Sequence, residues 1–334
     1  MKDAVDAFQQ VNRRYGNHQA VWAGLGRCYK QLGKYSLAEQ AFHRAGERFK
    51  GDTRRARDQA YAAGAVSLLV KNRLVSLVQP RPGNPSLWAG VISKPYTWEH
   101  KTNLQEPEII LFRFNRATRR AGILDRNSLQ CYEPEVGGEQ FSLYWLHLRH
   151  GGKTSAGVYQ SYMGADNESS DINFYRIDKT HLRHQGYFYG VFGIGTYPAT
   201  RSANLHLSLM SKWRSEWEDV YGWTSRGFQL QNSFFVSFYD SLPDIDEEAE
   251  DYTSKATAAT VRAIQGRYRE SLADWIDTIK DPVAPHLGTD SDNLAAARKR
   301  IRWLRHHEYN HWQLYRPYDL DVEAPPDSPR RGSH

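Results

Sequence analysis

Cysteine is almost absent from this chain of 334 residues, which contains only Cys28 and Cys131. The two lie in segments that we expect to belong to different domains. The sequence therefore predicts neither a disulfide framework nor a cysteine-based zinc knuckle. Sparing use of cysteine is typical of a reducing compartment and favours a cytoplasmic location.

Long apolar runs are missing as well. No stretch approaches the roughly 18 consecutive apolar residues that a membrane span needs. Residues 1–6 also lack the apolar run of a secretory signal. We therefore expect a soluble chain that has no membrane partner.

Acidic residues are fewer than basic ones, 38 against 44, which gives a net charge of +6. One acidic run, at residues 243–251, carries six of the negative charges, so the rest of the chain is more basic still. A basic balance helps a chain approach nucleic acid. Nucleic acid is therefore an alternative partner, although a solvated surface is the commoner explanation of mild basicity.

Residues 19–50 carry small and aromatic residues at fixed helical spacings. The spacings are Trp22-x-x-Leu25-Gly26-x-x-Tyr29, Leu32-Gly33-x-Tyr35 and Ala38-x-x-x-Phe42-x-x-Ala45. This pattern resembles the tetratricopeptide repeat, a unit of two antiparallel helices. The physics of the residues agrees, because small residues let two helices approach closely while large ones fill the seam. Gly33 is expected to end the first helix.

The flanking residues indicate partial repeats on either side. Ala4 and Phe8 lie 34 residues before Ala38 and Phe42, so residues 2–15 are expected to form the second helix of a preceding repeat. A degenerate helix is expected to run to about residue 72. A pattern that begins in mid-repeat favours a truncated array, and residues 331–334 resemble the start of an affinity tag.

The resemblance also implies a function. In this family the concave surface commonly receives peptides or helices, so the likeness implies a protein partner. Our candidate contact residues are charged or polar side chains of the first helix and the turn after it: Arg27, Lys30, Gln31 and Lys34.

After the repeats the sequence predicts a proline-rich connector at 73–107 and then strands. The period changes to 2 over residues 108–242, where candidate strands lie at 109–115, 141–149, 155–163, 171–178, 187–194, 203–210 and 228–240. Gly-Gly and other short polar turns between them predict an antiparallel meander, closed as a barrel or folded as a sandwich. Residues 213–226 are expected to interrupt it with a Trp-rich helix or loop.

The last third is expected to be helical. An acidic linker at 243–253 precedes a helical region at 254–316, and the tail at 317–334 is expected to be disordered. One helix would present a continuous apolar face from Val261 to Ile279, and a second would begin near Ser291 and end at Pro317. The predicted class is therefore α+β: tetratricopeptide-like hairpins, an antiparallel β meander and a C-terminal helical pair.

The sharpest catalytic pattern is His307-Glu308-Tyr309-Asn310-His311, which resembles the H-E-x-x-H motif of zinc hydrolases. On a helix, His307 and His311 would share one face and could hold zinc, while Glu308 activates the bound water. No G-x-x-H continuation follows, and the chain ends soon afterwards. Surface or hydrogen-bonding histidines are the commoner explanation, so no cofactor is expected, with zinc as the alternative.

Weaker patterns lie in the β region. The tetrapeptide His-Leu-Arg-His occurs at 147–150 and 181–184, and with His206 it could approach a metal, although exposed hairpin histidines are commoner. The glycines at 190, 193 and 195 lack the order of a dinucleotide loop and favour a β-bulge. Aromatic residues interleaved with arginine suggest either a stacking surface for bases or an ordinary aromatic core.

Taken together, the patterns favour a non-enzymatic interaction module. The repeats would dock a protein partner, as in an adaptor or sensor, and the β-domain would bind a second partner or ligand. The alternatives are a zinc-dependent hydrolase that uses His307, Glu308 and His311, and a nucleic-acid-binding protein.

Overall fold

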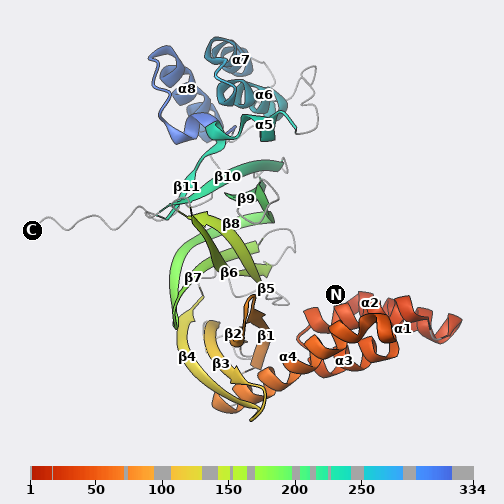
Figure 1. Cartoon of the computed structure of the whole chain (residues 1–334). Helices are drawn as coiled ribbons and strands as arrows, with labels where there is room; N and C mark the ends of the chain where they lie inside the picture. Colours follow the sequence, from red (N-terminus) through yellow and green to blue (C-terminus); the bar gives the residue numbers. More distant parts are fainter. Residues whose placement is uncertain are drawn as a thin grey trace, which may run out of the picture. The chain divides into compact units, whose positions relative to one another are not determined.

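The computed structural model describes most of the chain. The described residues are 2–16, 18–70, 74–93, 107–129, 142–150, 153–163, 170–197, 204–210, 216–224, 227–241, 252–280 and 291–317. The chain divides into two compact units, one of Met1–His147 with Ala156–Tyr187 and the other of Leu148–Ser155 with Phe188–His334. The predicted α+β class is confirmed, with helices at both ends and antiparallel sheets between them (Figure 1).

The first unit begins with four consecutive helices, α1 (Lys2–Tyr15), α2 (Gln19–Gln31), α3 (Tyr35–Arg44) and α4 (Lys50–Leu69). They pack where the sequence places small residues against large ones. An added Cβ at Gly26 would lie 2.7 Å from the Phe42 ring, and one at Gly24 would lie 2.6 Å from the Phe8 ring. Close approach of these helices therefore requires glycine at both positions.

Four antiparallel strands follow in the order β1-β2-β3-β4: β1 (Leu74–Arg81), β2 (Asn84–Ser93), β3 (Glu108–Asn115) and β4 (Arg120–Ser128). The expectation of a connector was wrong over residues 74–93, which form a hairpin, and residues 94–106 lie outside the described residues. Pro80 lies on the edge strand β1 and Pro85 near the start of β2, positions where a missing amide hydrogen costs little.

Helix α4 packs on this first sheet. Ala62 and Val66 of α4 belong to the same buried cluster as Trp88 and Phe112 of the sheet. The hairpin between β3 and β4 reaches back to the helix through an ion pair between Arg116 and Asp58 at 2.7 Å. The last helix of the N-terminal segment and the sheet therefore share one core.

The remaining strands form a sheet in the order β11-β10-β5-β6-β7-β8-β9. They are β5 (Ser142–His150), β6 (Lys153–Met163), β7 (Ser170–Asp178), β8 (His181–Tyr197), β9 (Asn204–Met210), β10 (Glu216–Thr224) and β11 (Gly227–Leu230). Strand β10 also pairs with β9, but it meets β5 only through the parallel pair of Trp223 and His150. The strands therefore do not close as a barrel, the first of the two predicted forms.

Within the first unit, side chains of β4 join the two sheets. Asp125 accepts a hydrogen bond from the Leu182 amide of β8 at 2.6 Å, and Asn127 donates one to the Leu182 carbonyl oxygen at 3.3 Å. Two side chains thus satisfy both backbone groups of one residue near the start of β8.

Two strand predictions were wrong. Residues 213–226 were expected to be a Trp-rich helix or loop, yet 216–224 form β10. Residues 228–240 were expected to be one strand, yet β11 ends at Leu230 and a 3₁₀ turn and the short helix α5 (Val236–Tyr239) follow. The register shift between Val191 and Gly193 of β8 does confirm an irregularity among the glycines at 190–195.

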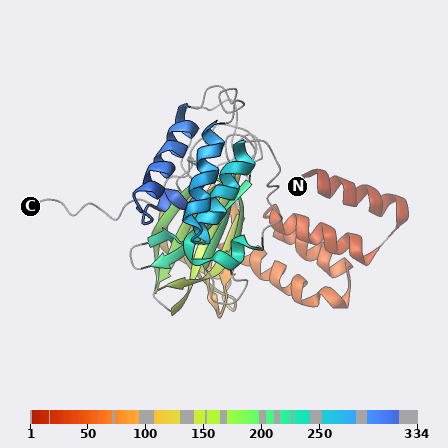
Figure 2. The ribbon, with the colours of Figure 1, turned by 90° about the horizontal axis from the view of Figure 1, so that it is seen from above.

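The second unit ends in helices α6 (Tyr252–Ile264), α7 (Tyr268–Lys280) and α8 (Ser291–Arg305), followed by the 3₁₀ turn η5 (Trp312–Tyr315). Figure 2 shows the three helices side by side. The sequence predicted one helix here, but α6 and α7 form a hairpin. The turn falls at Gly266, which has a φ of 76° and interrupts the continuous apolar face. Among the described helices, none combines the length and the apolar character needed to cross a bilayer.

Candidate interaction site and the histidine motif

The four predicted contact residues lie at the C-terminal end of α2 and the start of α3. Arg27, Gln31 and Lys34 are exposed. Lys30 is half-buried, and its pKa is lowered first by that burial and then by the positive charge of Arg55, while Asp52 opposes the shift. The first three side chains can therefore reach a partner, whereas Lys30 is held between α2 and the start of α4.

One flank of α1 is less covered than the equivalent flank of α3. In α3 and the residue after it, Ala38, Phe42 and Ala45 are 0%, 3% and 0% exposed. The residues 34 positions earlier are Ala4, Phe8 and Val11. Ala4 and Phe8 are only half-buried, and Val11 is 40% exposed. Phe8 of α1 packs against Gly24 of α2, as Phe42 of α3 packs against Gly26, so the less covered part of α1 is its end at Val11.

Comparison with known proteins agrees with this geometry. A family model of the tetratricopeptide repeat matches residues 1–62. The N-terminal helices are tetratricopeptide repeats. No curated protein and no solved structure matched the chain.

The tetratricopeptide segment consists of one intact repeat, α2 with α3, between two halves. Helix α1 corresponds to the second helix of a repeat and α4 to the first helix of the next. The second helix of that last repeat does not follow α4 in the chain, because strand β1 comes next. Helix α4 packs instead on the first sheet, where Ala62 and Val66 are buried. The sheet therefore takes the place of a further helix on the α4 side of the stack.

The histidine motif does not lie on a helix, contrary to expectation. Helix α8 ends at Arg305, and His307 has a φ of 59°. The His307 amide donates to the Leu304 carbonyl at 3.3 Å and the Glu308 amide donates to the Trp303 carbonyl at 2.8 Å, the two bonds of a Schellman helix end. The face that His307 and His311 were expected to share is therefore not formed.

Among the described residues, the same helix end also occurs after α2 and after α6, with glycine at the left-handed position. Gly33 has a φ of 68° after α2, and Gly266 has a φ of 76° after α6. Their amides and those of the next residues make the equivalent bonds back into the helix. The helix end at Gly33 was predicted from its glycine, whereas the end at His307, where no glycine stands, was not predicted.

The side chains of the motif point to different partners. His307 Nδ1 lies 2.6 Å from the Tyr309 hydroxyl, and His311 Nε2 lies 3.0 Å from Glu308 Oε2. The His311 ring also stacks on Trp303 with 4.4 Å between centroids. Among the described residues, no three His, Cys, Asp or Glu side chains gather in a way that could hold a metal ion. Zinc binding through His307 and His311, with Glu308 as base, stays a prediction that metal analysis of a His307→Ala, His311→Ala variant can test.

A pair of substitutions at His307 tests the helix end. We expect His307→Gly to be more stable than His307→Ala by about 1 kcal/mol, because only glycine adopts a positive φ without strain. Both variants lack the imidazole, so its contacts cancel in the comparison. Urea unfolding measures the difference. A more stable alanine variant would mean that the helix continues through the motif, since alanine exceeds glycine by about 1 kcal/mol inside a helix.

The other histidines are only partly described. His181 lies 3.7 Å from Asp125, and the His184 ring packs edge-on against Tyr175 with 5.2 Å between centroids. Partial burial lowers the pKa of His184. The side chains of His147, His150 and His206 lie outside the described residues, so the suggested metal site stays a prediction.

Proposed function

We propose that this chain is a protein-interaction module that engages a protein partner through its tetratricopeptide repeats. The observation that carries the proposal is the flank of α1, where Val11 is 40% and Tyr15 is 62% exposed. In the intact repeat, Ala45 corresponds to Val11 and is 0% exposed, and Phe49 corresponds to Tyr15 and is half-buried. An apolar helix flank of this kind fits a helix supplied by a protein partner or by a further repeat.

The predicted contact residues at the end of α2 and the start of α3 carry positive charge, which favours an acidic partner. Arg27 and Lys34 are exposed and have no carboxylate partner in the described parts of the chain. Gln31 lies between them and can donate or accept hydrogen bonds. Opposite charge on a partner would raise the association rate and fix its orientation.

The packing of the repeats on the first sheet suits an adaptor. Because α4 and the first sheet share one core, the repeats are anchored to the β strands rather than joined to them by a flexible linker. We propose that the β-domain carries a second partner or ligand, and that the protein works in the cytoplasm, as the scarcity of cysteine predicts. Support for these two points comes from the aromatic content and the two cysteines alone.

The first experiment identifies the partner and maps its contacts. Proteins captured on the full chain are identified by mass spectrometry, and the affinity of the purified candidate is then measured by calorimetry. We expect Arg27→Glu with Lys34→Glu to weaken binding about tenfold or more, since each reversal replaces attraction by repulsion. We expect Val11→Asp to do the same by placing a charge in an apolar contact.

The matched control is Arg269→Glu with Lys280→Glu on α7, which makes the same change of net charge. It should leave the affinity within twofold of the unmodified chain. Binding that survives both the α2 and the α1 substitutions would contradict the proposal that the repeats are the docking site.

A further inference from the structure

Helix α8 carries a row of exposed cations. Arg298, Lys299, Arg302 and Arg305 all lie on the solvent side, over about 10 Å of helix. Arg300 is the only basic residue of this helix that turns inward, where its Nε donates to the backbone carbonyl oxygen of Arg316 at 2.8 Å. The helix therefore segregates its basic residues by face.

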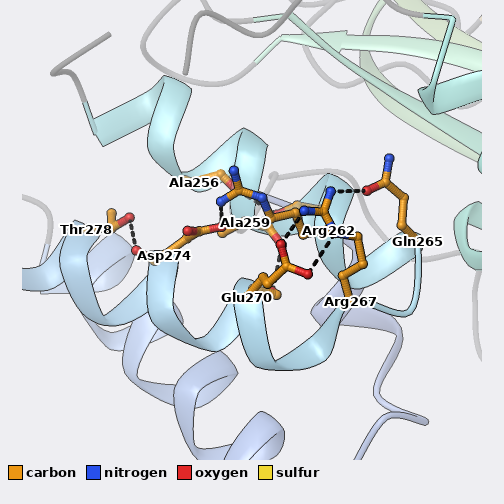
Figure 3. A network of polar contacts seen from close by, with 10 residues as sticks. Ala256, Ala259, Arg262, Gln265, Arg267, Glu270, Asp274 and Thr278 are labelled. Atoms are coloured by element: carbon orange, nitrogen blue, oxygen red, sulfur yellow. Dashed lines mark hydrogen bonds and ion pairs between the residues drawn. The ribbon is translucent and has the colours of Figure 1, made fainter. Parts of the chain in front are cut away.

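These four cations have no acidic partner in the described parts of the chain. The neighbouring helices differ, as Figure 3 shows: Arg262 of α6 pairs with Asp274 of α7, and Arg267 pairs with Glu270. Residues 291–316 hold six Arg or Lys residues against Asp292 and Glu308 alone. Like charges three or four residues apart on a helix repel one another by a few tenths of a kcal/mol. The helix dipole favours Arg302 and Arg305 in the last turn, and an anionic ligand would relieve the repulsion among all four cations.

The turn after α8 adds aromatic rings that follow the cations in the chain. The left-handed conformation of His307 reverses the chain, so that His311 stacks on Trp303 of α8. Tyr309 stacks on Tyr268 with 3.7 Å between centroids. Trp312 remains 43% exposed, and the Arg316 guanidinium lies 5.0 Å from its ring. An exposed ring on the turn that follows a row of unpaired cations supplies both elements of a surface for single-stranded nucleic acid, a stacking face and positive charge.

We propose that the exposed face of α8 and the turn at 307–312 bind single-stranded nucleic acid. Arg298, Lys299, Arg302 and Arg305 contact phosphates, and Trp312 stacks on a base. An acidic peptide or an anionic membrane would also satisfy the cations, but neither would offer Trp312 a base on which to stack. RNA and DNA both offer phosphates and bases, so we expect single-stranded RNA and single-stranded DNA to bind.

The binding test uses labelled single strands of 20 nucleotides, RNA and DNA of mixed sequence, with the full chain and fluorescence anisotropy. The slope of log affinity against log salt should be about −3, because four phosphate contacts each contribute about −0.7. The triple variant Arg298→Glu, Arg302→Glu, Arg305→Glu should lose about a hundredfold in affinity at low salt and most of that slope. Trp312→Ala should lose about tenfold and keep the slope, whereas Trp312→Phe should bind nearly as well as the unmodified chain.

The matched control reverses three exposed cations of the N-terminal helices, Arg13→Glu, Arg14→Glu and Arg48→Glu, and should bind as the unmodified chain does. Circular dichroism confirms that each variant is folded. The proposal is overturned if no single strand binds at 50 mM salt, or if the triple variant and the control bind equally. It is also overturned if duplex DNA and heparin compete as well as single strands while Trp312→Ala has no effect, since the face then recognises polyanions in general. Binding to phosphatidylserine vesicles without binding to either strand would assign the face to a membrane instead.

Discussion

Replacing Asp219 with alanine should destabilise the second unit by about 3–5 kcal/mol, because it leaves the buried guanidinium of Arg316 without its counter-charge. Asp219 is 0% and Arg316 is 2% exposed, and Arg316 Nη2 donates to Asp219 Oδ2. Removing one member of a buried pair costs more than the pair itself contributes. This is the largest effect that we expect from a single polar substitution in the described structure.

The pair belongs to a wider network that ties β10 to the C-terminal turn. Asp219 also accepts hydrogen bonds from Trp217 Nε1 at 2.9 Å and from Asn232 Nδ2 at 2.7 Å. Asn232 in turn donates to the Tyr315 carbonyl oxygen at 3.0 Å and accepts from the Val220 amide at 2.8 Å. A strand, a 3₁₀ turn and the residue after η5 therefore depend on one carboxylate.

Arg316 stays charged within this network. Burial alone would lower its pKa, but the neighbouring Asp219 and the Tyr221 hydroxyl hold that pKa above its usual value. Burial raises the pKa of Tyr221, so its hydroxyl stays protonated. The network is therefore a neutral cluster around one ion pair, and its loss on substitution is not offset by a change of protonation at neutral pH.

Two variants and a local measurement distinguish this effect from general damage. Hydrogen exchange should rise in β10 and at residues 312–316 in both Asp219→Ala and Arg316→Ala, and urea unfolding gives the loss of free energy. The double variant Asp219→Leu with Arg316→Met removes both charges, so it should be more stable than either single variant. Equal or greater destabilisation in the double variant would show that packing, and not the unpaired charge, dominates.

The alternation of apolar and polar residues and the spacing of small residues predicted those elements that bury one face. The strand at 204–210 and the intact repeat follow directly from period 2 and from the small residues of the helix seam. The strands β1 and β2 were missed because their prolines lie at an edge and near a strand start, where proline does not break pairing. Strand β10 was missed because its tryptophans signal burial without specifying a period.

The candidate sites were predictable only in part. Charge and helical spacing suggested Arg27, Gln31 and Lys34, which are exposed as expected, while their contact with a partner stays a prediction. The histidine motif was wrongly predicted to lie on a helix. The helix ends before it with His307 in a left-handed conformation, and no glycine in the sequence marks that end. The cations of α8 stand in the sequence as Arg298-Lys299-Arg300-Ile301-Arg302, but only the fold shows that Arg300 turns inward while the others face solvent.

Tyr35→Ala should destabilise the first unit by about 3–5 kcal/mol, the cost of deleting a buried aromatic side chain. Tyr35 is 3% exposed, and its hydroxyl accepts a hydrogen bond from the Val78 amide of β1 at 2.6 Å. Gln59 Nε2 donates to the carbonyl oxygen of the same residue at 2.8 Å. Because β1 is the edge strand of the sheet, two side chains of the repeats satisfy backbone groups that would otherwise be exposed to pairing with another chain.

The conservative variant separates the hydrogen bond from the packing. Tyr35→Phe keeps the ring but leaves the Val78 amide buried and unpaired, which should cost about 1–3 kcal/mol. Hydrogen exchange should then rise in both α3 and β1, since each holds one end of the contact. The control Tyr15→Ala, at a position that is 62% exposed, should change stability by no more than about 0.5 kcal/mol. A rise in exchange confined to α3 would show that β1 stays protected without the contact from Tyr35. The helices and the first sheet would then unfold separately.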